Sequence, residues 1–230
     1  MTSAPVVEAV RSALASAGDP DRAVAQQAYM KSAMPYRGIT APELKALLRP
    51  LLADPALELP GRGAWEGAVR ELWDGATHRE ERYAATALTG HRAYQRWQDP
   101  DTLELYRHLV VTGAWWDHVD EIASQRIGPI LLSHREEVTP VILDWAQDDD
   151  PWLRRTAVIS QLTFRERTDL GLLRATIEPN LDDTSFWLRK AIGWALRQYA
   201  RTDPDWVRAT VAEYGERLSG LSRREALKHL

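Results

Sequence analysis

Apolar residues recur along most of the chain at intervals of three and four, and few runs alternate between apolar and polar positions. The first spacing is typical of amphipathic helices and the second of half-buried strands, so the pattern predicts an all-α protein. The predicted helices span residues 5–17, 20–32, 41–53, 62–73, 78–91, 100–112, 115–127, 129–147 (in two pieces), 151–163, 168–178, 184–200, 204–217 and 222–229.

Signals for helix starts agree with these boundaries. Asp is a good N-cap and Pro fits the first helical turn, and Asp-Pro pairs begin segments at Asp19, Asp54, Asp99, Asp150 and Asp203. Three further sequences have the Ser/Thr-x-x-Glu form of a capping box, in which the two side chains bond to backbone N–H groups of the first turn. They are Thr40…Glu43, Thr77…Glu80 and Ser222…Glu225.

The later Asp-Pro pairs suggest a degenerate repeat. Those at residues 99, 150 and 203 are 51 and 53 residues apart, and each begins an apolar-periodic helix. HEAT-type arrays repeat a helix pair about every 40–47 residues. We therefore expect a curved, superhelical α-solenoid of HEAT-like antiparallel helix pairs, forming a single domain over residues 1–230, whose concave side is the natural binding surface.

The helix predicted after the glycine break at Gly113 holds the first candidate functional pair. Its buried stripe is expected to be Trp115, Val119, Ile122 and Ala123. Trp116 and Asp120 are four residues apart and lie side by side on a neighbouring face. A half-buried carboxylate needs a partner or a function. Either Asp120 caps or salt-bridges a neighbouring helix, or it belongs to a site.

Two later helices carry candidate basic residues. In the helix over 151–163, Val158, Ile159 and Leu162 form the expected core, whereas Arg154 and Arg155 lie about 100° apart around the axis. Both arginines are solvated, or one points into a groove.

The helix over 184–200 places Trp187, Lys190, Trp194 and Arg197 on one stripe. A lysine between rings needs an anion, and the stripe would suit a surface that faces phosphate and sugar; the alternative is a solvated lysine beside two partly buried rings. Gly193 weakens this helix, so we expect a close neighbour at its backbone.

Composition excludes several kinds of site. The chain has no cysteine, and therefore no disulfide, thiolate nucleophile or cysteine-based zinc site. Its six histidines show no metal-binding spacing, and we expect neither a metal nor a cofactor. The first residues do not form a signal peptide, and no stretch reaches the roughly 20 apolar residues of a membrane span. We expect a soluble, cytoplasmic protein with no membrane partner.

Charge and aromatic content refine this interpretation. Residues 152–230 hold 14 Lys and Arg against 10 Asp and Glu, whereas residues 1–151 hold 15 against 23. A basic C-terminal third is compatible with an anion-binding face, although the overall net charge is −4. The chain also has ten Trp against two Phe. We expect most of these Trp side chains in the core, and Trp is also well suited to contact a cation or a sugar.

Several motifs together resemble the AlkD-like family of DNA alkylation repair enzymes, which are DNA glycosylases built from HEAT-like repeats. The resemblance extends from about Tyr29 to Leu230. The motifs are Tyr29-Met30-Lys31…Pro35-Tyr36-x-Gly38-Ile39…Pro42-Glu43, Trp115-Trp116-Asp117-x-Val119-Asp120-x-Ile122-Ala123, Trp152-x-Arg154-Arg155-Thr156-Ala157, Arg189-Lys190-Ala191-Ile192-Gly193-Trp194-Ala195-Leu196-Arg197 and Ser222-Arg223-Arg224-Glu225-Ala226-Leu227.

The resemblance implies removal of cationic N3- and N7-alkylated purines, such as 3-methyladenine and 7-methylguanine, from duplex DNA. It implies that Asp120 faces the sugar as it turns positive, that Trp116 and Trp194 lie against that sugar, and that Arg155 holds a backbone phosphate. It also implies chemistry at the sugar without a tight pocket for the base. Such a role requires Asp120 to lie outside structural ion pairs. We expect the protein to act as a monomer.

The further candidates for contacts with DNA are the basic residues of the motifs and three positions in the N-terminal and middle parts of the chain. They are Arg154, Arg189, Lys190, Arg197, Arg223, Arg224, Tyr29, Thr40 and Thr163. The family often has Gln at the position of Thr40 and Lys at that of Thr163, so we expect the two threonines to alter contacts with DNA, and with them affinity and lesion preference. Two alternatives are a non-catalytic relative that binds unusual DNA structures and a helical-repeat protein that binds another protein.

Overall fold

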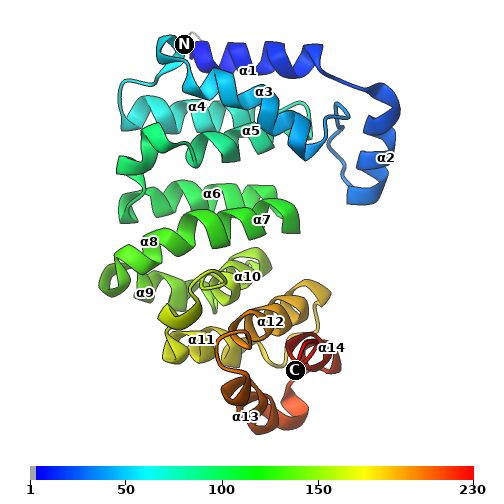
Figure 1. Ribbon diagram of the computed structural model, residues 1–230, viewed down its shortest axis with the longest axis vertical. Coiled ribbons are helices and arrows are strands. Elements are labelled where there is room, and N and C mark those ends of the chain that lie inside the picture. Colours follow the sequence, from blue (N-terminus) through cyan, green and yellow to red (C-terminus); the bar gives the residue numbers. More distant parts are fainter. Residues whose placement is uncertain (1–3) are drawn as a thin grey trace. The chain divides into compact units, whose positions relative to one another are not determined.

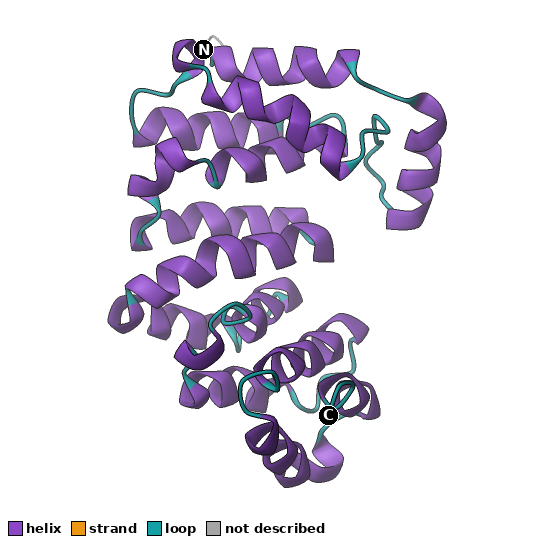
Figure 2. Cartoon of the chain, in the orientation of Figure 1, coloured by secondary structure: helices purple, strands orange, loops and turns teal. Residues whose placement is uncertain are grey.

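Helices dominate residues 4–230, the part of the chain that the computed structural model describes, and these residues contain no strand (Figures 1 and 2). The predicted all-α class is confirmed. The chain divides into two compact units, the first ending at Trp97 and the second running from Gln98 to Leu230. The single-domain organisation stays a prediction. No helix among the described residues is long and apolar enough to cross a membrane.

The first unit packs four of its helices together. Its helices are α1 (Pro5–Ser16), α2 (Pro20–Met30), α3 (Ala41–Ala53), α4 (Arg62–Asp74) and α5 (Arg79–Thr89), with short 3₁₀ turns at Pro55–Leu57 and Arg92–Trp97. Helices α1, α3, α4 and α5 contact one another, and Trp65 and Trp73 are fully buried among them. Helix α2 lies to one side of these four in Figure 1 and buries only Met30.

The second unit contains the predicted site. Its helices are α6 (Leu103–Gly113), α7 (Trp116–Ile122), α8 (Gly128–Ser133), α9 (Arg135–Trp145), α10 (Pro151–Ile159), α11 (Leu170–Ile177), α12 (Phe186–Tyr199), α13 (Pro204–Tyr214) and α14 (Gly220–Ala226), with 3₁₀ turns at Pro100–Thr102, Arg165–Arg167, Glu178–Asn180 and Gly215–Arg217. Helix α10 packs against α6, α7 and α12, and α12 packs against α14. Their shared core includes Val158, Ile159 and Leu196.

The helix predicted over 115–127 is divided. Helix α7 begins at Trp116 and ends at Ile122, and a π-helical segment, Ala123–Ile127, follows it. Trp115 is the N-cap of α7 and is only half buried, so its assignment to the core stripe is wrong, whereas Val119, Ile122 and Ala123 are fully buried. The chain turns before α7 at Ala114, with φ 41°, and not at Gly113, which ends α6.

Most helix starts predicted from capping residues are confirmed, because the capping side chain bonds to backbone N–H groups of its own helix. The side chains of Asp19, Asp54, Asp150 and Asp203 accept backbone N–H bonds at their helix starts, as predicted, whereas that of Asp99 makes no such cap. Thr40 and Glu43 form the predicted capping box.

The capping boxes predicted at Thr77…Glu80 and Ser222…Glu225 are wrong, because both glutamates bond to residues far away in the sequence. Glu80 is buried and accepts backbone N–H bonds from Arg37, Gly38 and Ile39, and Glu225 pairs with basic residues of α12. Helix α14 is capped instead by Ser219.

The expected close neighbour at Gly193 is α14. A Cβ built on Gly193 would lie 2.6 Å from Glu225 Cβ and 2.8 Å from the Ser222 backbone oxygen. Because a backbone carbonyl yields little, Gly193→Ala should overpack this contact at a cost of about 2–3 kcal/mol, offset by about 1 kcal/mol of helix propensity. We expect a net fall of about 1–2 kcal/mol in the free energy of unfolding, measured by urea denaturation.

A matched control for this variant is Gly67→Ala in α4, where a Cβ would meet nothing within 4 Å. That substitution should raise the free energy of unfolding by up to about 1 kcal/mol. Equal effects at the two glycines would contradict close packing of α12 on α14.

Candidate functional site

Asp120 and Arg155 form an ion pair with two hydrogen bonds that joins α7 to α10. Arg155 Nε donates to Asp120 Oδ1 at 2.7 Å, and Arg155 Nη2 donates to Asp120 Oδ2 at 2.8 Å. Arg155 Nη1 also donates to the backbone carbonyl of Trp187 in α12. The pair therefore connects three helices.

Asp120 does not meet the condition set from the sequence, that it lie outside structural ion pairs, and the alternative that it salt-bridges a neighbouring helix is correct. The condition was too strict, because it did not allow for a partner from the same candidate site. Two features keep Asp120 a candidate site residue. Its partner is Arg155, which the sequence assigns to the same site, and 14% of the Asp120 side chain stays exposed, against 5% for Arg155. Each carboxylate oxygen has two lone pairs and accepts one hydrogen bond from Arg155, the one donor to it among residues 4–230.

Burial and Arg155 shift the pKa of Asp120 in opposite directions. Burial raises the pKa of the Asp120 carboxyl above its usual value, and the nearby Asp117 adds to the rise, whereas the hydrogen bonds and charge of Arg155 counteract it. Burial of the Asp120 carboxylate thus disfavours its ionised form, whereas Arg155 favours that form. Loss of Arg155 would leave that carboxylate largely desolvated without a counter-charge.

Four tryptophans lie at the starts of the three helices that the ion pair connects. Trp116 lies on α7 four residues before Asp120 and is half buried. Trp115, Trp152 and Trp187, from the starts of three helices, pack against one another with ring centroids 5.4–6.2 Å apart. The sequence signal missed this cluster, because the three residues are far apart in the chain and their rings meet only when α7, α10 and α12 pack.

The predicted stripe on α12 meets an anion that belongs to the protein. Trp194 is half buried against the core. Lys190 Nζ donates to Glu225 Oε2 at 2.6 Å, and Arg197 Nη1 pairs with Glu225 Oε1. The sequence correctly predicts that Lys190 needs an anion but does not identify Glu225. The only available signal was Glu225 itself, whose charge we assigned to a cap of its own helix.

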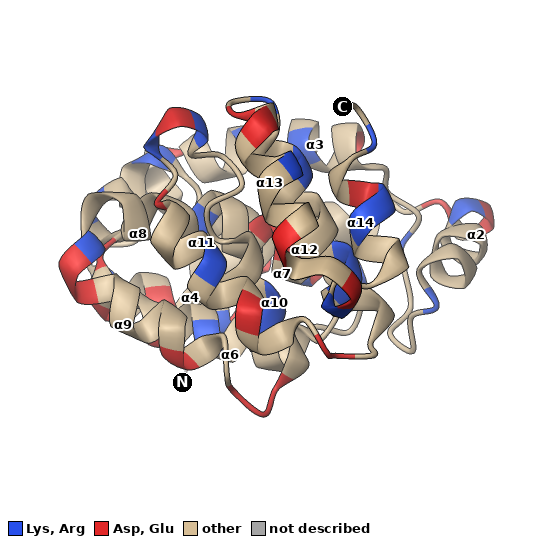
Figure 3. Ribbon diagram, turned by 90° about the horizontal axis from the view of Figure 1, so that it is seen from below, with Lys and Arg blue, Asp and Glu red and all other residues tan. Residues whose placement is uncertain are grey.

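The other basic candidates differ in how strongly they are held. Arg154 pairs with Asp183 at 3.0 Å, Arg189 Nε donates to the Asp183 carbonyl, and Arg223 donates to the Gly215 carbonyl. Arg224 is exposed and has no ion-pair partner among the residues described. In Figure 3, α14 carries basic and acidic residues side by side.

The three uncharged candidates are surface residues. Thr163 is exposed after α10 in the second unit. In the first unit, Tyr29 near the end of α2 is 79% exposed, and the Thr40 backbone N–H and hydroxyl both donate to Glu43.

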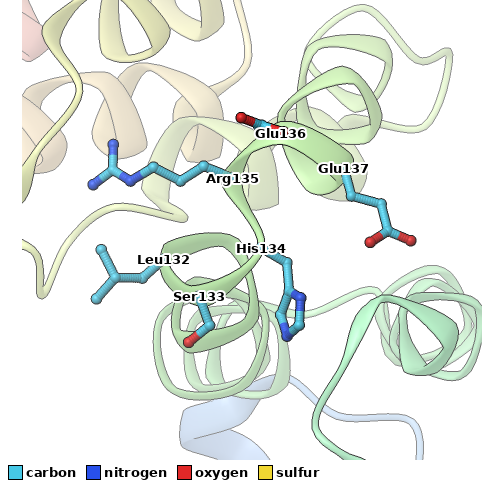
Figure 4. Close-up of a pocket in the computed structure, with 6 residues that line it drawn as sticks. All are labelled: Leu132, Ser133, His134, Arg135, Glu136 and Glu137. Atoms are coloured by element: carbon cyan, nitrogen blue, oxygen red, sulfur yellow. The ribbon is translucent and has the colours of Figure 1, made fainter.

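Two surface pockets of the second unit involve none of these residues. The larger, of about 490 Å³, lies at the corner between α8 and α9 and is lined by residues 132–137 (Figure 4). The side chains of Arg135 and Glu137 point away from each other in this view. The described residues also contain no cluster of three or more His, Asp or Glu side chains that could hold a metal ion.

Comparisons with known proteins place these observations in a family context. A family model described as DNA alkylation repair enzyme matches residues 10–230, which include every candidate above. A solved structure described as a predicted DNA alkylation repair enzyme from Enterococcus faecalis is similar to this chain with a TM-score of 0.82 and 31% identity, over 93% of this chain and 96% of that one. No match was found among curated proteins.

Proposed function

The chain belongs to the family of DNA alkylation repair enzymes, and from that premise we propose that it is a monofunctional DNA glycosylase. Its substrates are cationic N3- and N7-alkylated purines in duplex DNA, represented by 3-methyladenine and 7-methylguanine. The observation that carries this proposal is the environment of Asp120, a largely buried carboxylate that is hydrogen-bonded by Arg155, which favours its ionised form, and that keeps part of its surface open to solvent.

The proposed reaction breaks the bond between C1′ of the deoxyribose and the alkylated purine. The bonding electrons move to the cationic purine, which leaves as a neutral base, and positive charge develops on the sugar. A water molecule adds to C1′ and loses a proton, which leaves an abasic deoxyribose. An anion placed beside the sugar before the reaction stabilises the charge as it forms, with no need to reorganise solvent.

Each candidate side chain has a role in this reaction. Asp120 faces the sugar cation and accepts the proton of the attacking water, directly or through solvent. The negative faces of the Trp116 and Trp194 rings complement the same cation, a contact worth about 0.5–2 kcal/mol for each ring. Arg155 positions Asp120. Its side chain is 5% exposed and already makes three hydrogen bonds, which favours this role over the phosphate contact expected from sequence.

Contacts with the DNA backbone come from the basic residues that remain accessible. Arg224 is the best candidate because it is exposed and unpaired within residues 4–230. Arg154, Arg189 and Arg223 are half buried and held by acceptors of the protein, so a phosphate would compete with those acceptors. Tyr29, Thr40 and Thr163 stay candidates on the strength of the sequence resemblance alone.

Incubation of the purified protein with methylated duplex DNA, followed by chromatography of the freed bases, tests the proposed activity. We expect 7-methylguanine and 3-methyladenine in the soluble fraction and abasic sites in the DNA. Duplex binding without base release would favour the non-catalytic relative. Absence of both would favour a protein-binding solenoid.

The pH dependence of base release tests the state of Asp120. Because Asp120 acts in its ionised form and its pKa is raised, release should fall as the pH drops through that raised pKa, above the ordinary aspartate value of about 3.9. Arg155→Gln removes a group that lowers this pKa, so the acidic limb should move to higher pH. Single-turnover rates over a pH series, corrected for spontaneous depurination, measure the shift. An identical acidic limb in both proteins would contradict the coupling.

A further inference from the structure

Helix α14 packs directly on the α12 face that carries Gly193, next to the stripe that holds Trp194. The close approach at Gly193 brings Glu225 and the Ser222 carbonyl onto α12, and the Ser222 hydroxyl donates to the Arg189 carbonyl at 2.8 Å. These contacts fix the Glu225 backbone at one position along α12. The placement of its carboxylate is therefore set by the packing of the two helices.

That carboxylate binds one basic residue on each side of Trp194. Lys190 precedes Trp194 by four residues and Arg197 follows it by three, so all three share one helical stripe. Lys190 pairs with Glu225 Oε2 at 2.6 Å and Arg197 with Glu225 Oε1. One anion thus occupies both cations that flank Trp194.

A phosphate from solvent can reach the two cations of these ion pairs. The Lys190 side chain is 39% exposed and that of Arg197 21%, whereas that of Glu225 is 11% exposed. Both cations therefore remain partly accessible to a phosphate from solvent, while the anion that holds them is the most buried of the three. Their availability depends on whether Glu225 is charged and in place.

We propose that Glu225 acts as an internal competitor for DNA phosphate, which withholds Lys190 and Arg197 from the backbone of undamaged duplex DNA and so limits non-specific binding beside Trp194. The proposal rests on the proposed function, since it concerns the same DNA-binding face. It replaces the expectation that both residues contact phosphate in the wild-type protein. Glu225 is thereby a residue that determines selectivity, with no part in bond cleavage.

The salt dependence of binding measures this effect, because each phosphate neutralised by a cation adds about 0.9 to the slope of log K against log salt concentration. Glu225→Gln keeps the size of the side chain and removes its charge. We expect a slope on undamaged duplex DNA that is steeper by about 0.9 for one released cation or about 1.8 for two, with affinity at 50 mM salt higher on the order of tenfold. An unchanged slope would overturn the proposal.

Two controls separate release of these cations from a general change in charge. Glu213→Gln in α13 makes the same change in net charge and removes the 2.7 Å ion pair with Arg174 of α11, which keeps Glu178 and Thr210 as partners. The slope of this variant should equal that of the wild type. The triple variant Glu225→Gln, Lys190→Gln, Arg197→Gln should also return to the wild-type slope. A steeper slope in either control would assign the effect to overall charge and contradict the proposal.

A third variant leaves Glu225 unchanged, so that the packing of α14 on α12 is not disturbed at this residue. Lys190→Gln alone, in the presence of Glu225, should leave the slope unchanged, because Lys190 is already occupied. A decrease of about 0.9 would show that Lys190 contacts phosphate in the wild-type protein, and the proposal would be wrong.

Base release by the wild-type protein distinguishes this failure from failure of the proposed function. If the wild type binds duplex DNA and releases 7-methylguanine but Glu225→Gln leaves the slope unchanged, only the role of Glu225 is wrong. If the wild type neither binds nor releases, both proposals fall.

Discussion

Asp120→Asn reduces the single-turnover release of 7-methylguanine by about 10²–10³-fold, the effect of losing one preorganised charged contact in a transition state. Asparagine has almost the same shape and can still accept a hydrogen bond from Arg155, but it carries no charge to oppose the sugar cation. Duplex binding should be retained or slightly tighter, because a negative group has been removed from a surface that meets phosphate. The measurement is base release with enzyme in excess, together with a gel shift on the same duplex.

Glu121→Gln is the matched control for this variant. Glu121 is the next residue on α7, its side chain is 45% exposed, and it pairs with Arg126 at 2.9 Å. The Glu121→Gln substitution removes the same formal charge from the same helix and should leave the rate of base release within a few-fold of the wild-type rate. Equal losses in the two variants would mean that net charge on α7 matters and that Asp120 has no particular role.

Arg155→Gln produces the largest combined effect on stability and activity. Removal of one partner leaves Asp120 as a largely buried carboxylate without a counter-charge, which typically costs about 3–5 kcal/mol. We expect the lower end of this range, because part of the Asp120 side chain is exposed. Base release should fall on the order of 10²-fold, since Asp120 is neither held in place nor kept ionised. Urea denaturation and single-turnover release measure the two losses.

The double variant Asp120→Asn, Arg155→Gln shows whether the residues act as a unit. Without a buried charge to leave unpaired, it should be more stable than Arg155→Gln alone, and its loss of activity should be far smaller than the product of the single losses. Strict additivity would contradict a shared role.

Arg155→Gln also decides between positioning and phosphate binding. A salt slope equal to that of the wild type supports positioning, and a slope lower by about 0.9 shows a phosphate contact.

Periodicity predicts most of the helices because each amphipathic stripe is a local property of the sequence. The starts of α2, α10 and α13 follow from Asp side chains that cap their own helices. The π-helical segment after α7 could not be predicted, because its five residues carry no repeating pattern of their own. The turn at Ala114 was missed for a similar reason, since alanine rarely adopts positive φ and gives no signal of it.

The candidate site was harder to predict because its partners are far apart in the sequence. The helical offset between Arg154 and Arg155 indicates that they diverge but not which one enters the protein; the packing of α7 and α12 around α10 decides it. Glu80 and Glu225 both fit the local pattern of a cap, and both pair instead with groups 28 or more residues away in the sequence. For charged residues, the choice between a local and a distant partner is made by tertiary packing.

The most direct test of the central claim, that the Asp120 carboxylate stabilises a sugar cation during excision, is single-turnover release of 7-methylguanine from a duplex that contains one lesion. Wild-type protein, Asp120→Asn and Glu121→Gln should be compared under conditions where all three bind the duplex equally. The account predicts rapid release by the wild type and by Glu121→Gln, with a loss of at least about 100-fold in Asp120→Asn. Equal release by all three proteins, or no release by the wild type despite full binding, would contradict it.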